Sequence, residues 1–314
     1  YKESESVEFP QTLVADGIIR MGIPFVPFED FVQMQTNSPV WKGGFAEGTW
    51  LKLPKSGKIE YSRDGDWRFP KGAMVLQHFM YMWGRPIETH LYESNGDGTF
   101  RASAYRWGTV SAGASENADA AIVSRSIFQP LDNDNDTMWL SPGPVVRLDP
   151  KTAIFGFQPQ FTTRQLNRDG QIEKWNRSGW FTKRLTKSEL EDMPKLDHLQ
   201  DENVPEIERI RSYLDSNCAS CHKPGGAARG FFDARILTSF EDQNLVSDEL
   251  MAGDLGIEGA KLVVPGDPEK SILYQRLARK DGFRMPPGSV NSKDSPVLPL
   301  LEKWIRELGN GEGN

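Results

Sequence analysis

The chain has few of the residues that most often bind metals or form cross-links. Its 314 residues include only two cysteines and four histidines. Two cysteines exclude a disulfide-rich scaffold. The sequence also has no apolar run long enough for a transmembrane helix, so we predict no membrane span. A formal net charge of −7 argues against nucleic acid or an anionic membrane surface as a partner.

Both cysteines lie in one short motif, Cys218-Ala219-Ser220-Cys221-His222. Two thiols three positions apart can form thioether bonds to the two vinyl groups of one porphyrin. The histidine that follows can then bind the iron as its proximal ligand. The motif therefore predicts one covalent haem c, attached through Cys218 and Cys221 and ligated by His222.

Three other interpretations of the motif have weaker support. A thioredoxin-like dithiol requires a βαβ context and seldom has histidine as the next residue. A structural zinc ion requires four ligands, and His198 is the nearest remaining histidine. A disulfide across two intervening residues would be strained and would hold little of the chain together.

The second axial ligand must come from another residue type, because no histidine follows His222. Met285 lies between Arg284 and Pro286, about sixty residues downstream, where small cytochromes c often carry a distal methionine. The adjacent prolines stiffen the loop and lower the entropic cost of presenting the thioether. Met251 is the other methionine after the motif, and no proline follows it. We predict Met285 as the distal ligand, with the ordinary fate of a core methionine as the alternative.

The C-terminal third has helical periodicity. Apolar residues recur at helical spacing over 204–217, 268–280 and 297–308. A helix that enters the CxxCH motif and a terminal helix packed across it are what a class I cytochrome c requires. We therefore predict an all-α, class I-like cytochrome c domain over residues 204–314.

The preceding part of the chain has the pattern of a β-rich domain. Residues 73–79, 87–92 and 100–107 are candidate strands, and the Asn-Gly-Asp-Gly sequence at 95–98 predicts a hairpin turn. Strands at this spacing favour an antiparallel β-sandwich or barrel. The expected fold class is α+β with two domains.

The predicted boundary between the domains follows the change in composition near residue 190. Residues 1–190 form the β-rich domain, whose role the residues do not reveal. A charged segment with a proline, residues 191–203, is interpreted as a linker.

Two further groups of side chains have metal-binding alternatives. His78 and His90 lie on neighbouring candidate strands. They could form part of a copper or zinc site or line a small-molecule pocket, although two such histidines are more often ordinary polar residues on a sheet face. Asp132, Asp134 and Asp136 alternate in a short run that suits calcium. That run lacks the glycine and distal glutamate of an EF-hand loop, so a solvated acidic loop is the favoured interpretation.

Several segments of the chain after about residue 35 also invite comparison with a known family. They are residues 66–72, 88–91, 105–107, 164–167, 218–229, 253–260 and 264–268. These segments resemble a largely uncharacterised family of secreted bacterial c-type cytochromes, whose members usually carry two haems. The resemblance implies haem-attachment and axial roles for Cys218, Cys221, His222 and Met285. Some members are fused to, or encoded near, sugar-dehydrogenase-like or carbohydrate-active modules.

The chain departs from this family at two places. Many relatives have a second CxxCH after the β-rich domain, whereas residues 139–147 here contain no cysteine. The family's glutamate-threonine-arginine is also replaced by Glu88-Thr89-His90. The sequence therefore predicts a monohaem variant.

These features lead to two functional hypotheses. The first is extracytoplasmic one-electron transfer with a redox partner protein, a donor dehydrogenase or an acceptor, and no catalytic residue in the chain. The β-rich domain would then dock a partner such as a carbohydrate-active module or a polysaccharide. The alternative is a redox enzyme whose β-rich domain binds a substrate, carbohydrate-related in one version, and whose cytochrome domain drains the electrons. Both place the protein in the periplasm or outside the cell, with its signal peptide removed.

Overall fold

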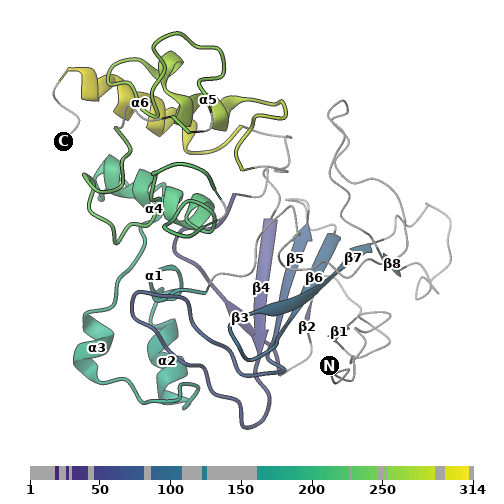
Figure 1. The fold of residues 1–314 in the computed structure, drawn as a ribbon. Coiled ribbons are helices and arrows are strands. Elements are labelled where there is room, and N and C mark those ends of the chain that lie inside the picture. The colour runs from purple at the N-terminus through teal and green to yellow at the C-terminus, as the bar shows by residue number, and fades with distance from the viewer. Residues whose placement is uncertain are drawn as a thin grey trace.

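The computed structural model describes most of the chain in two connected parts (Figure 1). The described residues are 18–20, 26–27, 30–41, 46–80, 86–107, 122–125, 161–226, 228–246, 250–251, 253–286 and 294–310. An antiparallel sheet comes first in the chain and a helical region follows it, so the fold is α+β overall. None of the described helices is long and apolar enough to cross a membrane.

The sheet is an antiparallel meander in which each strand pairs with the next one in the chain. Its strands are β3 (Val32–Met34), β4 (Ala46–Lys52), β5 (Met74–Met80), β6 (Pro86–Ser94), β7 (Phe100–Trp107) and β8 (Ile122–Arg125). A separate pair is formed by β1 (Ile19–Arg20) and β2 (Val26–Pro27). The three strands that the sequence predicted are confirmed as β5, β6 and β7.

The predicted hairpin turn joins β6 to β7. The Asn95 N–H donates to the Thr99 carbonyl oxygen over 3.0 Å. Gly96 and Gly98 have φ angles of 87° and 91°, in the left-handed region that glycine adopts without steric cost. The glycines at these positions therefore allow the tight reversal that fixes the register of β6 and β7.

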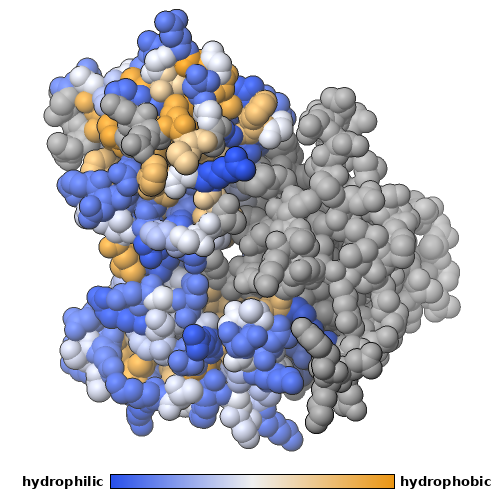
Figure 2. Space-filling view, in the orientation of Figure 1, coloured by the Kyte–Doolittle hydropathy of each residue, from blue (hydrophilic) through white to orange (hydrophobic). Residues whose placement is uncertain are grey.

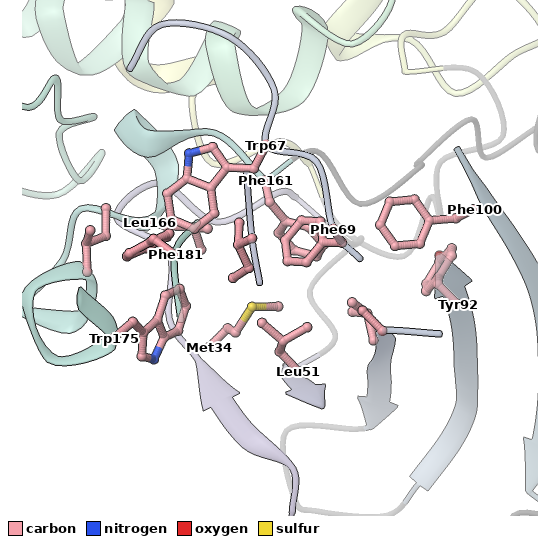
Figure 3. Close-up of a cluster of buried hydrophobic side chains, with 14 of the residues drawn as sticks. Met34, Leu51, Trp67, Phe69, Tyr92, Phe100, Phe161, Leu166, Trp175 and Phe181 are labelled. Carbon is pink, nitrogen blue, oxygen red and sulfur yellow. The ribbon is translucent and has the colours of Figure 1, made fainter. Parts of the chain in front are cut away.

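One face of the sheet packs against three short helices that the sequence did not predict. They are α1 (Thr163–Leu166), α2 (Gln171–Arg177) and α3 (Lys187–Glu191). Figure 3 shows the aromatic side chains that fill this interface, with Trp67 edge-on to Phe181 at a centroid distance of 5.3 Å. The indole N–H of Trp67 donates to Thr163 Oγ1 over 2.9 Å, so the buried ring keeps a hydrogen bond. The first part of the chain therefore has its own core.

The helical region has a second core built on the predicted amphipathic faces. Its helices are α4 (Glu206–Cys218), a 3-10 turn (Pro268–Lys270), α5 (Ile272–Ala278) and α6 (Leu298–Gly309). Leu301 and Trp304 of α6 are buried against Ile210 and Leu214 of α4 and their neighbours. The predicted helix over 268–280 is divided at Ser271, whose hydroxyl donates to the Asp267 carbonyl oxygen. The other two predicted helices are confirmed.

The segment interpreted as a linker packs against both cores. Leu196 is fully buried, and its N–H donates to the Arg164 carbonyl oxygen of α1 over 2.9 Å. The Asp197 N–H donates to the Ser212 hydroxyl of α4 over 2.9 Å. The segment between β3 and β4 also contacts α4, because the Trp41 N–H donates to Asn217 Oδ1 over 2.7 Å. The two parts are therefore joined by buried polar contacts as well as by the chain.

Candidate functional site

The two thiols and the following histidine lie together where α4 ends. Cys218 is the last residue of α4, and its carbonyl oxygen accepts hydrogen bonds from the N–H groups of Cys221 and His222, at 3.0 and 2.8 Å. These bonds continue the helix by one turn beyond its end. Neither cysteine forms a disulfide. Two free thiols and one imidazole are thus held on a single turn, as thioether attachment and axial ligation of one haem require.

The environment of Cys218 is unlike that of a redox-active dithiol. Burial, with a smaller contribution from neighbouring Cys221, raises the pKa of the Cys218 thiol to about 12. Redox-active dithiols instead have a thiol of lowered pKa that reacts as the thiolate. Among the described residues, no three or more His, Cys, Asp or Glu side chains are grouped so as to hold a metal ion.

His222 is partly buried in a setting that favours its neutral form. Burial, followed by the positive charge of Arg276, lowers the pKa of the imidazole. A neutral imidazole has a free nitrogen lone pair, which a metal ligand needs. The centroids of the His222 and Phe232 rings are 5.4 Å apart. The His222 carbonyl oxygen accepts a hydrogen bond from the Ala234 N–H over 2.9 Å. The loop that follows the motif therefore holds the position of the histidine.

Met285 follows α5 and is attached to that helix through the backbone. Its N–H donates to the Arg276 carbonyl oxygen over 2.9 Å, and its side chain is partly buried. The Arg276 guanidinium donates to the Phe283 carbonyl oxygen over 3.1 Å, which fixes the loop just before Met285. Because the charge of Arg276 also acts on His222, this arginine connects the segments that carry the two candidate axial ligands.

The part of the chain between the motif and Met285 exposes apolar side chains. Five large apolar residues there are between 44 and 59 % exposed: Phe231, Leu237, Val246, Met251 and Phe283. Figure 2 shows apolar side chains gathered on the lobe that contains α5 and α6. Two free thiols and a partly buried imidazole on one turn, followed by a segment that exposes large apolar side chains, are residues that suit a haem c.

Sequence patterns did not predict the role of several residues that support the site. Arg276 and Phe232 lie 54 and 10 positions after His222, at places where no motif distinguishes them. Arg164 of α1 and Asp215 of α4 form a buried ion pair. Asp215 lies three residues before Cys218. Each of these contacts depends on the folded arrangement of distant segments, which periodicity does not encode.

The strand register separates the two histidines of the sheet. His78 is opposite Thr89, whereas His90 is opposite Gln77, so the two imidazoles point to opposite faces. His78 is fully buried and its Nδ1 lies 2.7 Å from Thr89 Oγ1. His90 lies with its ring 4.8 Å from that of Phe79. A single copper or zinc ion held by both histidines is therefore incompatible with this sheet.

The proposed calcium ligands Asp132, Asp134 and Asp136 lie outside the described residues, as does the segment 139–147. The comparisons with known proteins give no further guidance. The chain matches no family model, no curated protein and no solved structure. The resemblance to secreted c-type cytochromes therefore stays a prediction.

Proposed function

We propose that this protein is a monohaem c-type cytochrome that transfers single electrons outside the cytoplasm. Cys218 and Cys221 would attach the haem through thioether bonds, with His222 and Met285 as the axial ligands. The observation that carries this proposal is the turn at the end of α4, which holds two free thiols and an imidazole together. When bound, haem c supplies a centre that takes up or gives up one electron.

The two proposed axial ligands would raise the reduction potential of this centre. Both axial ligands are uncharged, because burial favours the neutral imidazole of His222 and the thioether of Met285 carries no proton. Ligation by histidine and methionine raises the reduction potential relative to two histidines. With both ligands in place, no coordination position is open to oxygen or peroxide. These properties favour an electron carrier over an oxygen-activating enzyme.

The finer fold assignment is part of the same proposal. We assign the helical region to the class I-like cytochrome c type, because α4 leads into the motif and α6 packs on α4 in one core. We assign the sheet to a sandwich or barrel. In its support, β5 buries consecutive residues from Val75 to Phe79, which requires cover on both faces of the sheet.

The proposed partner is a redox protein that delivers or removes electrons in the periplasm or outside the cell. This location follows from the cofactor, because haem is attached to CxxCH motifs outside the bacterial cytoplasm. The alternative function, a redox enzyme whose first part binds a substrate, has one supporting observation. That observation is a polar cleft whose lining includes Ser220 of the CxxCH motif.

Measurement of the mass of the chain tests this proposal through covalent haem attachment. The chain is produced with a bacterial haem-attachment machinery, and its intact mass is measured after denaturation. We expect the mass of one haem to remain on the chain. Cys218→Ser combined with Cys221→Ser is expected to lose that mass, whereas Ser220→Ala is expected to keep it. A wild-type chain without added mass contradicts the proposal.

A further inference from the structure

A cleft of about 620 Å³ lies between the sheet and the helical region. One wall comes from β4 and β5, and another comes from residues 33–41 and α1. Residues 198–200 and the face of α4 close the third side, with Ser220 of the CxxCH motif among the lining residues. A volume of this size is typical of sites for small organic ligands.

Amide and hydroxyl side chains dominate the lining. Five glutamines contribute, at positions 33, 35, 77, 165 and 200. Glu47 and Arg168 are the only carboxylate and guanidinium among the described lining residues, so their formal charges balance. A charged ligand would find no matching excess of charge here. A neutral molecule with many hydrogen-bonding groups would find both donors and acceptors.

The sheet wall presents a preorganised polar group. Glu47 Oε1 accepts hydrogen bonds from Gln77 Nε2 and from Thr49 Oγ1, both at 3.1 Å. Gln77 is 91 % buried, because its side chain belongs to the covered face of β5. These two hydrogen bonds hold the exposed Glu47 carboxylate, which lines the cleft, in one orientation. A fixed carboxylate oxygen can accept a further hydrogen bond from a ligand hydroxyl.

The lining also includes one tryptophan, Trp41. Its backbone is fixed by the hydrogen bond to Asn217 of α4, and its side chain packs against the core of the helical region. The apolar face of an indole suits a molecule that has C–H faces. The cleft thus offers a fixed acceptor at Glu47 and an aromatic residue at Trp41.

We infer that this cleft binds a neutral, hydroxyl-rich solute of the size of a mono- or disaccharide, or a polyol. The inference rests on the amide-rich lining, the balanced charge, the volume and the fixed carboxylate of Glu47. It does not depend on haem attachment. Because Ser220 lies between the two thiols and also lines the cleft, the bound solute would lie beside the haem-attachment motif.

Binding is tested on the whole chain by isothermal titration calorimetry and by NMR of the tryptophan indole groups. The probes are glucose, xylose, sorbitol, cellobiose and maltose, with acetate and choline as charged comparisons. We expect at least one neutral probe to bind and to shift the indole N–H resonance of Trp41. That resonance is assigned from its absence in the spectrum of Trp41→Phe. The inference is overturned if none of the neutral probes binds at a concentration of about 10 mM, which is roughly tenfold above a dissociation constant of 1 mM.

Two substitutions locate the binding site. Gln77→Met removes the amide at similar side-chain size, and Thr49→Val removes the hydroxyl at equal shape. Each is expected to weaken binding of the probe about tenfold, the effect of one hydrogen bond of ordinary strength. Glu60→Gln, on an exposed residue that does not line the cleft, is the matched control and should leave binding unchanged. If Gln77→Met does not fold, the binding measured for Thr49→Val decides whether the probe binds in this cleft. Unchanged binding in the folded variants overturns the assignment to this cleft.

The result is distinguishable from that of the haem proposal. Loss of haem from the Cys218→Ser and Cys221→Ser variant bears only on attachment, whereas calorimetry of the Gln77 variant bears only on the solute. A chain that carries haem and binds no neutral probe supports the cytochrome and refutes the cleft. A chain that binds a neutral probe but carries no haem supports the cleft and refutes the cytochrome.

Discussion

Arg164 donates a hydrogen bond from Nε to Oδ2 of Asp215 over 2.6 Å, and both side chains are almost fully buried. Arg164 belongs to α1 of the first core, whereas Asp215 belongs to α4 of the second. The same carboxylate oxygen accepts from the Ile236 N–H over 2.9 Å. Burial raises the pKa of Asp215, and the charge of Arg164 opposes that shift. The pair therefore joins the two cores one turn before the CxxCH motif.

Removal of one partner from this pair should be strongly destabilising. In Arg164→Met, the Asp215 carboxylate stays buried without its counter-charge. We expect the free energy of unfolding to fall by about 3–5 kcal/mol, measured by urea denaturation. Arg177→Met removes an exposed ion pair with Glu173 and should cost about 1 kcal/mol or less. Equal losses in the two variants would refute the structural role of the buried pair.

Buried His78 should make stability depend on pH. Burial lowers the pKa of this imidazole from 6.5 to about 3, so the folded state binds fewer protons than the unfolded state between these values. Stability is therefore lost as the pH falls below about 6.5. By pH 4 we expect the histidine to cost on the order of 3 kcal/mol relative to pH 7. Urea denaturation of His78→Gln should show a smaller loss over this range, and an identical pH slope would contradict the assignment.

Leu166 and Leu301 test whether the two cores unfold together. Each leucine is fully buried, one in each core. Replacement by alanine should reduce the free energy of unfolding by about 2–5 kcal/mol in either case. Because buried contacts join the cores, we expect one thermal transition, shifted to lower temperature in both variants. Two transitions, of which each variant shifts only one, would show that the cores are independent.

Met285→Ala tests the distal ligand. We expect the haem to stay attached through the two cysteines, while the reduction potential falls by on the order of 100 mV and the iron becomes accessible to carbon monoxide. Potentiometric titration and carbon monoxide binding measure these effects. Met251→Ala is the matched control, because Met251 is exposed and is the other methionine after the motif. Similar behaviour of both variants and the wild type would remove Met285 from the site.

Elements with strong local patterns could be predicted from the sequence. Apolar segments bounded by turn residues indicated β5, β6 and β7. The helical stripe of α6 was readable because it buries one continuous apolar surface. The CxxCH motif was equally readable, because all of its residues lie on one turn of chain. The helices α1, α2 and α3 were missed, since 4, 7 and 5 residues are too few for a periodic pattern.

Features that depend on distant segments were not predictable. Arg164 and Asp215 are 51 positions apart, and no periodic signal links them. The interpretation of residues 191–203 as a linker did not foresee the burial of Leu196, because a charged segment can still place one side chain in a core. The cleft draws its lining from Gln33 to Pro296, so only the folded chain brings those groups together.

The most direct test of the central claim is a visible absorption spectrum of the purified chain in the oxidised and reduced states, with a pyridine haemochrome assay for haem per chain. We expect one c-type haem per chain, a low-spin spectrum, and the weak far-red band of a sulfur-to-iron bond from Met285. A chain without haem contradicts the assignment of Cys218, Cys221 and His222. A high-spin spectrum that lacks the far-red band contradicts ligation by Met285.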